Sequence, residues 1–153
     1  MLKYEYRPTE SCGLVSAHGA KMSKPIHVSG KRKKAIARAT LKEGKGMLKV
    51  NNQPLSNISS EFVRLKLQEP LFLAQDTVHK VDINVNVQGG GVVSQAEAAR
   101  LAIARALVIY NPKLKKVYLD YDRNLLVADV RQREPRKPNT GGKARAKTQK
   151  SYR

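Results

Sequence analysis

The sequence has little cysteine, histidine or aromatic residue, and each shortage excludes a class of protein. Its 153 residues include one Cys, three His, two Phe and no Trp. The single Cys12 can form neither an internal disulfide nor a usual four-ligand zinc site, which indicates a reducing, intracellular setting. The three His are scattered along the chain. We therefore expect no metal site and no cofactor.

Long apolar runs are also missing. No stretch approaches the roughly 18–20 apolar residues that a membrane span requires. The first 21 residues contain no unbroken apolar run of about 7–15 residues, which a secretory signal needs. These absences predict a soluble cytoplasmic protein with no membrane partner.

Acidic residues are outnumbered, because 30 Lys and Arg face 12 Asp and Glu and give a formal net charge of +18. The excess lies in two blocks. Residues 31–49 hold eight basic residues and one acidic residue, and residues 131–153 hold nine and one, whereas residues 50–130 are nearly neutral. Blocks of like charge repel themselves, and a polyanionic partner relieves that repulsion. The pattern predicts a near-neutral folded body with two basic segments that bind a polyanion.

Composition divides the chain into an N-terminal extension (residues 1–22), a globular domain (residues 23–130) and a C-terminal tail (residues 131–153). The domain holds nearly all bulky apolar residues, and the tail contains too few to build a core. Fully extended at about 3.3–3.6 Å per residue, the last 20 residues would reach roughly 65–70 Å. The tail is either a flexible solubilising segment or a chain that lies along RNA phosphates, and we favour the second reading.

Alternation of apolar and polar residues predicts the strands. In residues 33–42, alternate positions are Ala or Leu and most of the others are basic. A glycine turn follows, and residues 47–50 read as the returning strand of a hairpin. Residues 81–88 show the clearest pattern, with Val and Ile on one face and Asp, Asn and Gln on the other.

Helices are expected in two further segments. A short helix over residues 61–68 should stop before Pro70. A longer one over residues 94–110 should open with a capping box of Ser94 and Glu97 and end at Asn111. Residues 113–130 fit a helix or a strand. The fold class is therefore α+β, with a sheet of about four strands and two helices on one face.

Three glycines, Gly89, Gly90 and Gly91, join the strand at 81–88 to the helix that Ser94 opens. Glycines let a backbone approach phosphate, and a helix N-terminus binds it, so the junction is a candidate phosphate seat. A tight turn that needs positive φ explains the glycines equally well. Neither a P-loop nor a dinucleotide motif is present, which makes a small-molecule kinase-like enzyme the least favoured alternative.

Two features of the sequence favour RNA over DNA as the polyanion that the chain binds. The helix at 94–110 carries only Arg100 and Arg105, so it does not look like a base-reading recognition helix. A basic strand face with a long basic tail suits recognition of a folded RNA through its shape and backbone. We assign RNA binding to Lys31, Arg32, Lys33, Lys34 and Arg38, and to the tail residues Arg131, Arg133, Arg136, Lys137, Lys143, Arg145 and Lys147.

Four stretches resemble, in order, the signatures of the universal small-subunit ribosomal protein nine (S-nine) family. They are GKRKKAIARATLKEGKG, VDINVNVQGGG followed by QAEAARLAIARAL, DYDRNLLVADVRQREPRK, and the ending KARAKTQKSYR. The resemblance covers about residues 24–153. The run YDRNLLVADVRQ and the ending QKSYR look like the archaeal and eukaryotic branch.

This resemblance implies a fold like the second domain of ribosomal protein five. It also implies a place in the head of the small ribosomal subunit, bound to the 3′ major domain of its RNA and beside neighbouring head proteins. The terminal residues Lys150, Tyr152 and Arg153 would contact peptidyl-site tRNA. A free-standing RNA-binding protein remains the alternative function.

The chain departs from the family pattern in three places. The stretch NTGGKARAK stands where this branch usually has a Gly-Gly-Pro-Gly type sequence, and Ser94 stands where a Gly commonly begins the helix. Residues 1–21 match nothing in the family, and Met22 opens an ordinary-looking start. We therefore predict that translation begins at Met22.

Overall fold

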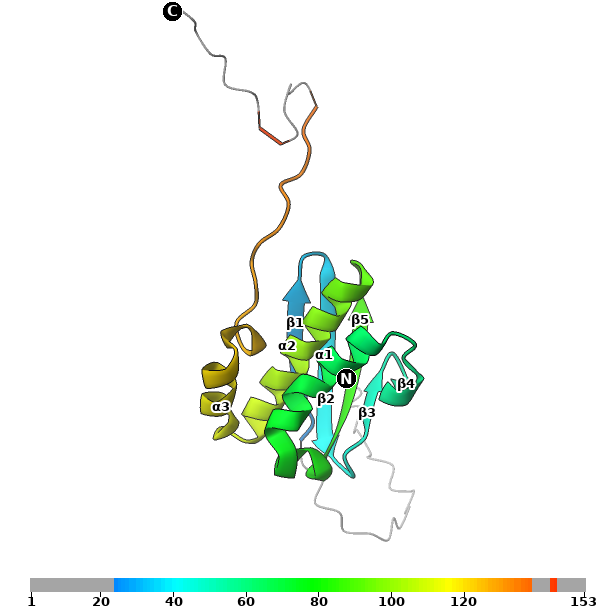
Figure 1. The fold of residues 1–153 in the computed structure, drawn as a ribbon, viewed down its shortest axis with the longest axis vertical. Coiled ribbons are helices and arrows are strands. Elements are labelled where there is room, and N and C mark those ends of the chain that lie inside the picture. The colour runs from blue at the N-terminus through cyan, green and yellow to red at the C-terminus, as the bar shows by residue number, and fades with distance from the viewer. Residues whose placement is uncertain (1–23, 139–143, 146–153) are drawn as a thin grey trace, which may run out of the picture.

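The computed structural model describes residues 24–138 and 144–145, which form a mixed sheet packed against helices (Figure 1). This confirms the α+β class. The expected count of about four strands and two helices is low, because the described residues hold a five-stranded sheet and three α-helices. The elements are β1 (Ile26–Arg32), β2 (Ala35–Glu43), β3 (Leu48–Val50), β4 (Gln53–Pro54), α1 (Glu61–Ala74), β5 (Val81–Gln88), α2 (Val92–Tyr110) and α3 (Leu114–Tyr121), with 3-10 turns η1 (Leu55–Asn57), η2 (Gln75–Lys80) and η3 (Arg123–Leu125).

The sheet has the order β1-β2-β5-β3-β4. Strand β5 runs antiparallel to β2 and parallel to β3, so it separates the two strands that we expected to form a hairpin. That expectation is wrong because the chain after β2 bonds to β5 instead. The backbone N–H of Gly44 donates to the Lys80 carbonyl at 3.0 Å, and that of Ile83 donates to the Met47 carbonyl at 2.9 Å. The strand with the best apolar face thus becomes the centre of the sheet.

Strand β1 was absent from the sequence prediction, and its partner is β2. The two strands pair from Ile26 opposite Leu41 to Arg32 opposite Ala35. The two-residue turn between them is Lys33–Lys34, with Lys33 in the left-handed region at φ 52°. We refer to residues 31–34 as the hairpin tip.

Helix α1 continues past the point where Pro70 was expected to end it. Proline removes a backbone donor and disfavours a helix interior, but here Leu67, Pro70 and Ala74 form a buried stripe on the helix. The buried Tyr118 hydroxyl of α3 also donates to the Pro70 carbonyl at 2.8 Å. Tertiary packing therefore outweighs the local signal.

Helix α2 begins at Val92 after Gly91, two residues earlier than expected, and no side chain caps it. The capping box of Ser94 and Glu97 is wrong, because the Glu97 carboxylate bonds to Arg32 of β1 instead. The predicted end is confirmed: Asn111 caps the last turn by donating its backbone N–H to the Leu107 carbonyl at 2.8 Å.

Small residues let α2 lie close to the sheet. Gly30 of β1 sits so near α2 that a Cβ added there would meet the Ala98 carbonyl oxygen at 2.3 Å. Helix α1 packs on α2, and both lie on the same side of the sheet (Figure 1). The core between these layers is mainly Ala, Val, Leu and Ile, with one buried Tyr118.

The segment that fitted either a helix or a strand forms α3 and then the turn η3, whose Leu125 is fully buried. Arg105 of α2 holds the following chain in place: its guanidinium donates to the carbonyls of Leu126 at 2.9 Å and Ser29 at 3.0 Å. None of the helices among the described residues combines the length and hydropathy needed to cross a bilayer.

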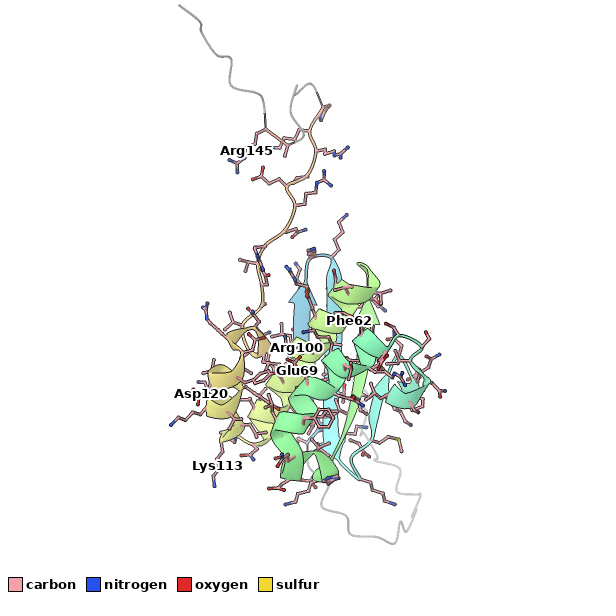
Figure 2. The ribbon with its side chains drawn as sticks, viewed as in Figure 1. Phe62, Glu69, Arg100, Lys113, Asp120 and Arg145 are labelled. Carbon is pink, nitrogen blue, oxygen red and sulfur yellow. The ribbon has the colours of Figure 1, made fainter. Side chains whose placement is uncertain are left out.

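A buried ion-pair cluster links the three helices. Arg100 of α2 lies 2.7 Å from Glu69 of α1 and 2.9 Å from Asp122, which follows α3. Figure 2 shows Arg100 and Glu69 side by side between α1 and α2. Burial alone would raise the pKa of Asp122. The hydrogen bond from the Asn124 backbone N–H and the Arg100 guanidinium together outweigh burial, so the pKa of Asp122 lies below its ordinary value. Arg100 is thus a structural residue.

Candidate nucleic-acid interface

The hairpin tip presents three exposed lysines, Lys31, Lys33 and Lys34. The tight turn brings them together at one end of the sheet. Residues 131–138 of the tail leave the body beside this end and extend beyond it (Figure 1). The hairpin tip and the start of the tail, about 100 residues apart in sequence, therefore meet in space.

Arg32 has a different position from its three neighbours. Its side chain is only 15% exposed, and its Nε lies 2.7 Å from Glu97 of α2. Its Nη2 lies 3.1 Å from Asp129, and its Nη1 donates to the Arg131 carbonyl at 3.2 Å. The guanidinium thus joins β1, α2 and the start of the tail.

Asp129 is the second member of this junction. It accepts hydrogen bonds from the Arg131 side chain and from the Arg131 backbone N–H. These bonds, with smaller help from Arg32, hold the pKa of Asp129 well below its usual range, and they raise the pKa of Arg131. The carboxylate is therefore ionised at neutral pH and holds both guanidinium groups at the start of the tail.

Beyond this junction the tail is exposed at every position from 131 to 138 and forms no helix or strand there. Arg133, Arg136 and Lys137 all lie on this exposed stretch, and Arg145 pairs with Glu134. Figure 2 shows Arg145 well away from the helices and sheet. Five of the predicted binding residues lie outside the described part of the chain: Lys143, Lys147, Lys150, Tyr152 and Arg153.

The glycine junction lies against the hairpin tip. Gly89 and Gly90 have φ of 74° and 71°, and a Cβ on Gly89 would meet the Lys34 carbonyl at 2.7 Å. These two positions require glycine for the turn and for close approach, which supports the structural reading. Gly91 is uncrowded. The phosphate seat formed by Gly89, Gly90, Gly91 and Ser94 stays a prediction, now located next to Lys34.

Arg38 does not lie with the hairpin tip. It sits mid-strand in β2, opposite Ser29 on one side and Asn86 on the other. This places it on the face of the sheet that α1 and α2 do not cover. Lys42, Lys49, Asn84 and Asn86 are exposed on the same face, and sequence reasoning did not assign them to a site. Strand alternation already put most of them on polar faces, but only the pairing of β2 with β5 makes those faces one surface.

Metal chemistry finds no support in the described part of the chain, where no group of three or more His, Cys, Asp or Glu side chains is placed to hold an ion. The arrangement instead offers exposed cations on a fixed turn and on an extended segment. Such a surface can bind phosphates.

Comparison with known proteins decides the family. A family model described as ribosomal protein S9/S16 matches residues 30–153. The chain belongs to the ribosomal protein S9/S16 family. It is 47% identical over 133 residues to the small ribosomal subunit protein uS9 of Methanococcus maripaludis strain C7, covering 85% of this chain and 99% of that protein. The protein of the same name from Methanothrix thermoacetophila is 50% identical over 132 residues, with the same coverage.

These S9/S16 relatives confirm the resemblance drawn from the four sequence stretches, and both come from methanogens, consistent with the archaeal-type branch. Membership in a ribosomal protein family also confirms that the chain is not an enzyme. The kinase-like alternative is therefore dropped.

Proposed function

We propose that this S9/S16 family member is a structural protein of the small ribosomal subunit. It binds small-subunit ribosomal RNA through the hairpin tip and the tail, in the cytoplasm and within the ribosome. The relatives named above are small-subunit proteins, and the family model matches residues 30–153, the range that holds all four sequence stretches. The observation that carries the RNA-binding role is the meeting of the hairpin tip and the start of the basic tail at one end of the body.

The geometry supports a division of labour between the basic residues. Lys31, Lys33 and Lys34 are exposed on a rigid turn and are free to reach phosphates. Arg32 is held inside by Glu97 and Asp129, so it acts by positioning the start of the tail. A fixed start limits the directions in which the tail can leave the body, and this lowers the entropy lost when the tail binds.

The finer parts of the proposal concern the partners. The RNA contacted is the 3′ major domain, and the protein neighbours are other proteins of the subunit head. Residues 131–138 of the tail extend away from the body, as the start of a segment that reaches a distant site must. Its last residues, Lys150, Tyr152 and Arg153, then contact the backbone of peptidyl-site tRNA.

Sedimentation tests the ribosomal role. The full chain, expressed with a tag in a related archaeon, should co-migrate with small subunits on a sucrose gradient after a high-salt wash. A free-standing RNA-binding protein would stay at the top of the gradient, and that result would reject the proposal. On the same subunits, Arg153→Ala should reduce retention of peptidyl-site tRNA without changing the amount of protein incorporated. Reduced incorporation would contradict the tRNA role of this residue.

A further inference from the structure

One whole face of the sheet carries no helix in the described part of the chain. Helices α1 and α2 lie on the other face (Figure 1). We refer to the uncovered side as the open face. Its side chains are His27, Ser29 and Lys31 of β1, Ile36, Arg38, Thr40 and Lys42 of β2, Asp82, Asn84, Asn86 and Gln88 of β5, and Lys49 of β3.

The charge of the open face is strongly positive. Four side chains carry a positive charge and one, Asp82, carries a negative charge. Asp82 is already engaged, because its Oδ1 accepts the backbone N–H groups of Lys45 and Met47 at 2.9 Å each. Its charge therefore organises the turn before β3 and leaves a positive surface around it.

Strand propensity does not explain the Asn residues of this face. Asn is depleted in strands, where Val, Ile and Thr are favoured, yet the central strand β5 places Asn84 and Asn86 there. Among the described residues, the side chains of Arg38, Asn84 and Asn86 have no hydrogen-bonding partner. Arg38 lies directly opposite Asn86, and Asn84 lies between Thr40 and Lys49. Donors and acceptors are thus grouped at the middle of the sheet.

The face is also hollowed. One depression of about 270 Å³ lies between Lys42 and Lys49. A second depression, of about 370 Å³, lies between His27 and Arg38. Thr40 lines both depressions. The first is lined by Lys42, Lys49 and Asn84, and the second by Arg38 and Asn86, so each has at least one cation and one amide.

These features fit one kind of occupant. Phosphates match the cations, and ribose hydroxyls match the Asn and Thr side chains. The face has no Tyr, Phe or Trp for stacking on bases. Ile36 and Met47 are the bulky apolar side chains exposed at or beside it, which is too little for the apolar centre of a protein interface. Lys31 belongs to both the open face and the hairpin tip, so the two surfaces are continuous.

We propose that the open face is a second RNA-binding surface, which takes the sugar-phosphate backbone of ribosomal RNA across β2 and β5. This inference rests on the proposed function, because the ligand is the same RNA. It adds Lys42, Lys49, Asn84 and Asn86 to the predicted contacts and assigns Arg38 to this surface.

The test compares three charge variants of the full chain in binding to the 3′ major domain of small-subunit RNA at several salt concentrations. The open-face variant is Arg38→Gln with Lys42→Gln and Lys49→Gln. The tip variant is Lys33→Gln with Lys34→Gln. The matched control is Lys113→Gln with Lys115→Gln and Lys116→Gln, which removes three exposed charges near the start of α3. Figure 2 shows Lys113 at the end of the body away from the tail.

We expect the binding of the open-face variant to depend less steeply on salt concentration than that of the wild type. Each lost phosphate contact lowers the slope of log K against log salt by roughly 0.7–0.9, so three contacts should lower it by about 2–3. The slope of the tip variant should be lower by about 1.4–1.8, and the control should have the slope of the wild type. A second variant, Asn84→Ala with Asn86→Ala, should bind roughly fivefold more weakly with an unchanged slope, because it removes hydrogen bonds but no charge.

The outcomes separate the two proposals. If the open-face variant keeps the wild-type slope while the tip variant loses slope, the open face is not an RNA surface and the proposed function stands. If neither variant changes the slope, the hairpin tip also fails as an RNA contact, and only the tail remains to carry the RNA binding of the proposed function. If the open-face variants bind RNA normally but fail to enter small subunits, a protein neighbour occupies the face, and the inference is overturned.

Discussion

The two faces of the sheet are built from the same strands and have opposite properties. On the covered face, alternate residues of β2 from Ala35 to Leu41 and of β5 from Val81 to Val87 are Ala, Leu, Val and Ile, and all are buried. On the open face, the residues between them are mainly Arg, Lys, Thr and Asn, and most are exposed. Two neighbouring residues of a strand therefore occupy one core position and one surface position, because successive side chains point to opposite sides of the sheet.

This contrast separates stability from recognition. Substitutions on the covered face should change the free energy of unfolding, and substitutions on the open face should change RNA binding. Pairs of adjacent residues test the separation best, since they share the same backbone and differ only in the face that they occupy.

The largest difference in unfolding free energy is expected between the variants Ile83→Ala and Asn84→Ala in β5. Ile83 is 3% exposed, so its truncation leaves a cavity and should cost about 2–5 kcal/mol of unfolding free energy. Asn84 is exposed, and its truncation should change this free energy by less than about 0.5 kcal/mol. Urea unfolding followed by circular dichroism measures both. Equal losses would show that the open face is part of the core.

A smaller difference in stability is expected between the variants Gly30→Ala and Ser29→Ala in β1. The added methyl group at Gly30 would collide with the backbone of α2, at 2.3 Å from the Ala98 oxygen and 2.8 Å from the Ala102 nitrogen. The helix must shift, at a cost of about 1–3 kcal/mol. Ser29 lies on the open face and is the control. Melting temperatures of the two variants give the comparison, and a Gly30→Ala protein as stable as the wild type would disprove the close packing of α2 on β1.

The smallest effect concerns pH and the one carboxylate of the open face. The backbone N–H groups of Met47 and Lys45 lower the pKa of Asp82 below its ordinary value. Because the folded-state pKa is depressed, this stabilisation is complete above the unfolded-state pKa of about 3.9 and is lost as the pH falls through the folded value. Asp82→Asn lacks this titration. The difference in unfolding free energy between wild type and variant should therefore shrink from pH 7 to pH 3, and a constant difference would contradict this role of Asp82.

Sequence reasoning succeeded where the signal was local. The alternation in β5 and the stop of α2 at Asn111 depend on neighbouring residues, and both are confirmed. It failed at Pro70, where a helix stop was expected, because burial of Pro70 and the bond from Tyr118 come from other elements. The capping box failed for a related reason, since Glu97 has an alternative partner in Arg32, 65 residues away.

The candidate site shows the same division. Runs of basic residues in the sequence were enough to predict that Lys31, Lys33, Lys34 and the tail bind RNA. Nothing in the sequence separates Arg32 from those lysines, because its ion pairs with Glu97 and Asp129 exist only after the chain has folded. In the same way, Asn84 and Asn86 become neighbours of Arg38 and Thr40 only when β5 pairs with β2.

By itself, the sequence determined the family, the α+β class and the division of charge between a nearly neutral body and two basic segments. These properties follow from composition, short-range periodicity and signature stretches, which need no knowledge of contacts. The tertiary structure alone decided the strand order, the inward position of Arg32 and the existence of an open face. Each of these depends on contacts between residues far apart in the chain, and local patterns carry no information about which distant residues meet.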